Sequence, residues 1–71
     1  MDSPRTIIAT PDEATRIHGI ATAADLAIGE TKEGPDYWVT ARPSTWRALA
    51  SLLDHDESDE PIQAKIAEVV K

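Results

Sequence analysis

The chain has 71 residues and carries 7 Lys+Arg against 13 Asp+Glu, which gives a formal net charge of −6. It contains no cysteine, which excludes disulfides and thiolate metal sites, and its acidity argues against broad binding to nucleic acid. Residues 1–71 are expected to form a single small domain, whose limited core raises the expectation of a partner.

The N-terminal part predicts a short strand. Residues 1–4 are expected to be a flexible N-terminus, without the basic and apolar layout of a signal peptide. Residues 5–9 are rich in β-branched side chains and are bounded by Pro4 and Pro11. This composition is typical of an edge strand or of a docked arm.

A helix is predicted to follow over residues 11–18. Thr10 and Glu13 have the spacing of a capping box, and Pro11 suits the first helical position. Gly19 accepts the left-handed conformation that often follows a helix, so we expect the helix to end there.

Residues 20–30 fit either a helix or a strand. Thr22 can cap a short helix through the alanines that follow, whereas Leu26 and Ile28 alternate as in a strand. The strand reading fits the next segment better, because a Gly-Pro turn signal at 34–35 precedes a run of high β-propensity at 37–41. We therefore expect a β-hairpin over residues 26–41.

Two helices are predicted in the C-terminal half, over residues 45–54 and 61–70. In the first, Trp46, Leu49 and Leu53 recur at helical spacing, with Ser44 or Thr45 as the cap. In the second, the apolar residues are Ile62, Ile66, Val69 and Val70. The three helices and the hairpin together predict an α+β fold.

An acidic run connects these two helices. It offers five carboxylates as candidate contacts with a basic partner: Asp54, Asp56, Glu57, Asp59 and Glu60. The run does not make a calcium loop, because Asp59 stands where the glycine belongs and Lys65 stands where the bidentate glutamate belongs. We expect neither a metal nor a cofactor, and a solvated connection is the simpler interpretation.

A basic and aromatic segment precedes the first of these helices. Arg42 and Arg47 flank Trp46, and Trp38 lies shortly before them. Both tryptophans suit a core, but tryptophan and arginine are also the usual anchors of protein interfaces. We count Trp38, Arg42, Trp46 and Arg47 as candidate partner-binding residues.

No catalytic motif is visible, and no enzyme activity is expected. No serine of the chain lies in a Gly-x-Ser-x-Gly elbow, and the glycines form neither a dinucleotide fingerprint nor a phosphate loop. A helix, Gly19 and a second helix over residues 12–28 would make a helix-turn-helix DNA reader, but residues 20–29 contain no Arg, Lys, Asn or Gln to read bases.

Residues 27–50 resemble a family of small actinobacterial proteins. The similar pieces are Glu30-Thr31-Lys32 in a turn and Pro43-Ser44-Thr45-Trp46 at the start of a helix. The family includes the BldB-like developmental regulators, whose biochemical function is unknown. The resemblance implies a regulatory partner protein in an antitoxin-like pair, and it implies no catalytic residues.

The sequence thus predicts a small acidic, cytoplasmic protein of a bacterium or phage that binds another protein. The partner is expected to be basic, such as a toxin or a transcription regulator, and the acidic run would steer it by long-range attraction. A DNA-binding repressor and a homo-oligomeric structural protein, such as a homodimer, are the alternatives. No membrane contact is expected, since no segment has the roughly 20 apolar residues of a membrane span.

Overall fold

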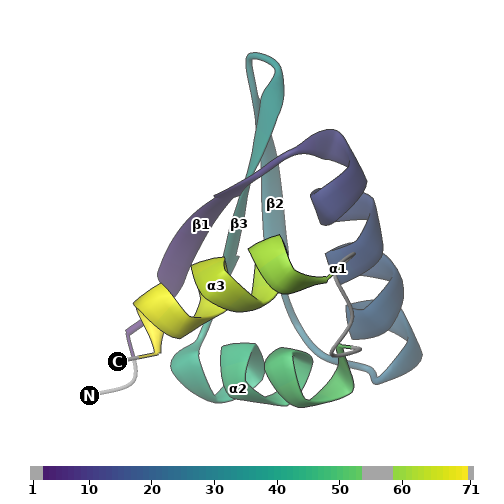
Figure 1. Cartoon of the computed structure of the whole chain (residues 1–71), viewed down its shortest axis with the longest axis vertical. Helices are drawn as coiled ribbons and strands as arrows, with labels where there is room; N and C mark the ends of the chain where they lie inside the picture. The colour runs from purple at the N-terminus through teal and green to yellow at the C-terminus, as the bar shows by residue number, and fades with distance from the viewer. Residues whose placement is uncertain (1–2, 54–58, 71) are drawn as a thin grey trace.

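Three antiparallel strands form the sheet of an α+β fold, which confirms the expected fold class (Figure 1). The computed structural model describes residues 3–53 and 59–70. The strands are β1 (Arg5–Ala9), β2 (Gly29–Glu33) and β3 (Asp36–Ala41), and β3 lies between the other two. The edge strand expected over residues 5–9 is confirmed.

The pleat gives the sheet two chemically different faces. Ile7 and Val39 are paired neighbours on β1 and β3, and both are buried against the helices. Ile8 and Trp38 are also paired, and both point to the opposite face, because successive residues of a strand alternate. The helices therefore take one face of the sheet and leave the other open.

The hairpin of β2 and β3 closes with two residues, Gly34 and Pro35. Gly34 has a φ of 63°, and Glu33 pairs with Asp36 across the turn. A positive φ at the first turn position only, followed by a proline, is the pattern of a type II′ turn, whose twist suits a hairpin. The strands occupy a shorter range than the predicted 26–41, because the preceding residues complete the end of a helix.

Helix α1 (Pro11–Ala23) begins as predicted and ends later than predicted. Thr10 Oγ1 accepts from the Glu13 backbone N–H, and Glu13 Oε1 accepts from the Thr10 N–H, so the capping box is confirmed. The end at Gly19 is wrong, and so is the helix-turn-helix reading, because residues 11–23 form one helix. Burial of Ala21 on the core face outweighs the roughly 1 kcal/mol that a helical glycine costs.

The actual end of α1 is a Schellman motif with aspartate in the left-handed position. Asp25 has a φ of 58°. The Leu26 N–H donates to the Ala21 carbonyl at 2.8 Å, and the Asp25 N–H donates to the Thr22 carbonyl at 3.3 Å. These bonds satisfy carbonyl groups in the last turn of the helix. They require a positive φ at Asp25, which is strained for a residue other than glycine. The negative charge of Asp25 is also unfavourable beside the negative end of the helix dipole.

Replacing Asp25 with glycine is therefore expected to stabilise the fold by about 1 kcal/mol, since glycine adopts a positive φ without strain. For a domain of this size that corresponds to a rise in Tm of about 4–8 °C. Asp25→Asn removes the charge and keeps the strain, so its gain is expected to be a few tenths of a kcal/mol. A fall in the Tm of Asp25→Gly, measured by thermal unfolding, would contradict this account.

The other two helices are α2 (Pro43–Leu52) and α3 (Glu60–Val69), close to the predicted ranges of 45–54 and 61–70. Helix α2 begins two residues early, because Pro43 occupies its first turn. Arg42 is its N-cap, and no side chain caps it, so the predicted cap at Ser44 or Thr45 is wrong.

The core lies between the helices and the covered face of the sheet. Trp46 of α2 is completely buried there, and its Nε1 donates to the backbone carbonyl of Arg5 at 3.0 Å. This bond ties the start of β1 to α2. The other large side chains that are almost fully buried are Ile17, Val39, Leu49, Ile62 and Ile66.

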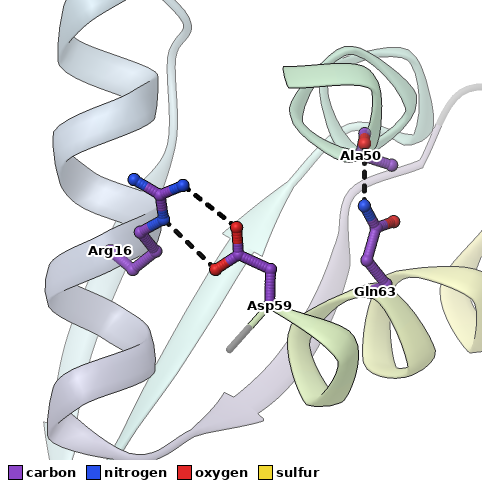
Figure 2. Close-up of polar contacts among 4 residues, drawn as sticks. All are labelled: Arg16, Ala50, Asp59 and Gln63. Atoms are coloured by element: carbon purple, nitrogen blue, oxygen red, sulfur yellow. Dashed lines mark hydrogen bonds and ion pairs between the residues drawn. The ribbon is translucent and has the colours of Figure 1, made fainter. Parts of the chain in front are cut away.

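Polar contacts hold α3 against both other helices (Figure 2). Arg16 of α1 donates through Nε and Nη2 to the two carboxylate oxygens of Asp59, at 3.2 and 3.0 Å. Gln63 Nε2 donates to the Ala50 carbonyl at 3.1 Å, near the end of α2 where helical carbonyls lack helical partners. Lys65 of α3 also pairs with Glu13 of α1.

The Glu13–Lys65 pair makes stability depend on pH. Partial burial raises the pKa of Glu13, but the hydrogen bond and charge of Lys65, with the bonds from Thr10, bring it below its ordinary value of 4.5. A carboxyl group with a lowered pKa stabilises the fold above its unfolded pKa, and this contribution is lost as the pH falls through the folded pKa. Between about pH 5 and pH 3, wild type should therefore lose more stability than Glu13→Gln. Parallel curves of urea midpoint against pH for the two proteins would contradict this.

Candidate functional site

The open face of the sheet is the candidate functional site. The strand register places its residues in two rows, Thr6 beside Thr40, and Ile8 beside Trp38 beside Thr31. Thr6 and Thr40 are joined by a hydrogen bond of 2.7 Å between their hydroxyl oxygens. We use the name open face for these five residues: Thr6, Ile8, Thr31, Trp38 and Thr40.

The second row exposes apolar surface at its centre. Trp38 is 46% exposed and its neighbour Ile8 is 54% exposed. The remaining large apolar side chain that the described part of the chain exposes is Leu52, which lies at the end of α2. Adjacent exposed aromatic and aliphatic side chains on a rigid sheet are typical of a protein contact surface.

The two tryptophans thus have opposite roles. Trp38 is accessible on the open face, whereas Trp46 lies in the core with none of its surface exposed. We therefore remove Trp46 from the candidate partner-binding residues. Ile8 was not among the sequence candidates, although residues 7 and 8 are both apolar and one of two consecutive strand residues must face outward.

A hollow continues the open face toward the start of α2. It has a volume of about 530 Å³, and Thr40 and Arg42 are among the residues that line it. Arg42 and Arg47 are both exposed, but only Arg42 borders the open face through this hollow. Among the described residues that line this hollow, Arg42 is the one with a charged side chain.

A second hollow of about 230 Å³ lies between α1 and the hairpin. Its lining includes Thr15, His18, Glu30 and Tyr37. His18 Nδ1 lies 3.6 Å from Glu30 Oε1, and the His18 side chain is 66% exposed. The Thr15 hydroxyl donates to the Pro11 carbonyl at 2.9 Å, so His18 does not activate it as a nucleophile.

The acidic candidates divide into three groups. Asp54, Asp56 and Glu57 lie outside the described residues. Glu60 is exposed in the first turn of α3, where its charge favours the helix dipole. Asp59 is only 3% exposed and binds Arg16, so it belongs to the packing of the helices, not to a solvated run.

Residues 3–53 and 59–70 contain no group of three or more His, Cys, Asp or Glu side chains placed to hold a metal ion. Across the same residues, each buried side-chain nitrogen or oxygen has a hydrogen-bond partner. In this part of the chain, no helix is long and apolar enough to cross a membrane.

Comparison with models of known protein families gave no match, and comparisons with curated proteins and with solved structures gave none either.

Proposed function

We propose that this chain is a non-catalytic protein-binding module that contacts its partner through the open face. The observation that carries the proposal is the exposed pair of Ile8 and Trp38 on a sheet whose other face packs Ile7 and Val39 against the helices. Tryptophan buries a large area on binding with little loss of side-chain freedom, and it is enriched among the residues that dominate interface energies.

The charges around the open face indicate the chemistry of the partner. Glu33 and Asp36 face each other beside the hairpin turn, at the end of the sheet away from Arg42. The chain as a whole has a net charge of −6. A partner with an apolar patch flanked by basic side chains fits this surface, and its association would be fastest at low salt.

A regulatory, antitoxin-like role is the specific form of this proposal. It is supported by the resemblance of residues 27–50 to the BldB-like family, and by the order of elements in that segment. Those residues hold β2, β3 and most of α2, which agrees with the strand, strand and helix order that the resemblance implies. The expected turn at Glu30-Thr31-Lys32 is wrong, because these residues lie within β2 and the chain turns at Gly34 and Pro35.

The test compares variants at two exposed apolar positions. Partners are captured from cells of the source, and each captured protein is purified and titrated by calorimetry against wild type, Trp38→Ala and Leu52→Ala. Trp38→Ala should weaken the binding of the partner that uses the open face by about 30-fold or more, which is the effect of a hot-spot residue. Leu52→Ala is the matched control, exposed to a similar extent but outside the open face, and should change the affinity by less than about threefold. An affinity that depends on Leu52 and not on Trp38 would overturn the proposal.

A further inference from the structure

Strand β2 is an unusually bare edge of the sheet. All five of its residues are exposed, and among the strands of residues 3–53 and 59–70 it pairs with β3 alone. An edge strand presents unpaired backbone N–H and C=O groups, which another strand can satisfy. What could pair with this edge is decided by its side chains.

The charges of β2 are complementary to themselves. Glu30 and Lys32 lie on either side of Thr31 and point to the same face of the sheet. If a second β2 lies antiparallel with Thr31 opposite Thr31, Glu30 lies opposite Lys32 of the second copy, and Lys32 lies opposite its Glu30. A register moved by two residues places Glu30 against Glu30 or Lys32 against Lys32, which is unfavourable.

We propose that a second copy of this chain pairs with β2 in this register, which joins two sheets into one of six strands. Charged edge strands, lysine above all, commonly serve to prevent such pairing. In this strand each lysine meets a glutamate of the other copy, so the same charges select one register and one partner.

The helices leave room for this pairing. Helix α1 lies beside β2, since His18 approaches Glu30. Strands are spaced about 4.8 Å apart, so the two copies of β3 would lie about 14 Å apart. This span is wider than the roughly 8–10 Å at which two helices usually pack, so it can accommodate one α1 helix from each copy. The exposed Thr15 and His18 would meet their counterparts there and cover the smaller hollow.

The pairing would also extend the open face. Ile8, Trp38 and Thr31 form one row. The twofold axis of the proposed dimer passes between the two Thr31 residues. The row would therefore continue through Thr31, Trp38 and Ile8 of the second copy. The inference does not depend on the proposed function, but it would give the module two tryptophans on one surface.

A charge-swap experiment tests the dimer. The mass of the protein is measured by sedimentation equilibrium over about 1–500 µM for wild type, Glu30→Lys, Lys32→Glu and the double variant Glu30→Lys/Lys32→Glu. Wild type should show a concentration-dependent dimer, and each single change should weaken it about tenfold or more, because it makes both cross-strand pairs repulsive. The double variant restores opposite charges and should dimerise within about threefold of wild type. Arg47→Glu, on the exposed surface of α2, is the matched control and should leave the dimer intact.

Hydrogen exchange of the wild-type protein provides an independent measurement that needs no variant. The amide groups of residues 29–33 should exchange more slowly as the concentration rises, while exposed amides of α2 do not change. Three results would overturn the proposal: a monomer at all concentrations, a dimer that is indifferent to the single reversals, or exchange at β2 that is independent of concentration.

Discussion

Replacing Trp46 with alanine is expected to lower the free energy of unfolding by about 3–5 kcal/mol. The side chain is fully buried, and its indole N–H satisfies the Arg5 carbonyl, so the change creates a cavity and also removes a hydrogen bond. A domain of this length is stabilised by only about 4–10 kcal/mol in total. The variant should therefore lose about half of the stability of the fold, as measured by its urea midpoint.

The second tryptophan provides the matched control. Trp38→Ala removes the same side chain from the open face, and it should cost less than about 1 kcal/mol because the ring is half exposed. Trp46→Phe keeps most of the buried ring and should fall between the two. Equal losses for the alanine variants at positions 38 and 46 would show that the two faces of the sheet are not as different as described.

Replacing Arg16 with methionine is expected to destabilise the fold by about 2–4 kcal/mol, since it removes both hydrogen bonds of the guanidinium from a buried carboxylate. The Asp59 side chain is 4% exposed, whereas that of Arg16 is 44% exposed. The penalty therefore comes mainly from Asp59, whose carboxylate is buried in the folded chain. Chemical denaturation measures this loss as a lower midpoint, and the m-value should equal that of wild type.

Two further variants separate this ion pair from the general effect of losing an arginine. Arg47→Met removes an exposed arginine from α2 and should change stability by less than about 0.5 kcal/mol. Arg16→Met combined with Asp59→Asn should be less destabilised than the sum of the single changes, because a neutral amide tolerates the loss of the Arg16 contact better than a buried carboxylate does. Strict additivity would mean that the two groups do not depend on each other.

Local signals predicted most of the fold. The capping box at Thr10, the hairpin turn at Gly34 and the apolar spacing of the last two helices all act over a few residues, so the sequence displays them directly. The end of α1 could not be read in this way. Gly19 is an adequate stop signal, and the burial of Ala21 in the core, a tertiary effect, favours the continuation of the helix past it.

The candidate site was predicted less completely, because exposure depends on which side of an element faces the core. The helical period already groups Trp46 with Leu49 and Leu53, and all three are buried. Trp38 lies next to Val39 in a strand, so one of the two must face outward, but the sequence does not say which. Asp59 looked like part of an acidic run, and its long-range partner Arg16 is what removes it from solvent.

The helices take one face of the sheet and leave Trp38 exposed on the other, and the fluorescence of this tryptophan tests that difference directly. Trp46→Phe leaves Trp38 as the single tryptophan, so the quenching of its fluorescence by acrylamide measures the open face alone. We predict red-shifted emission and efficient quenching in the folded variant, close to those of the urea-unfolded chain. Blue-shifted emission that acrylamide does not reach would mean that the face is covered, and it would contradict the open face as a binding surface.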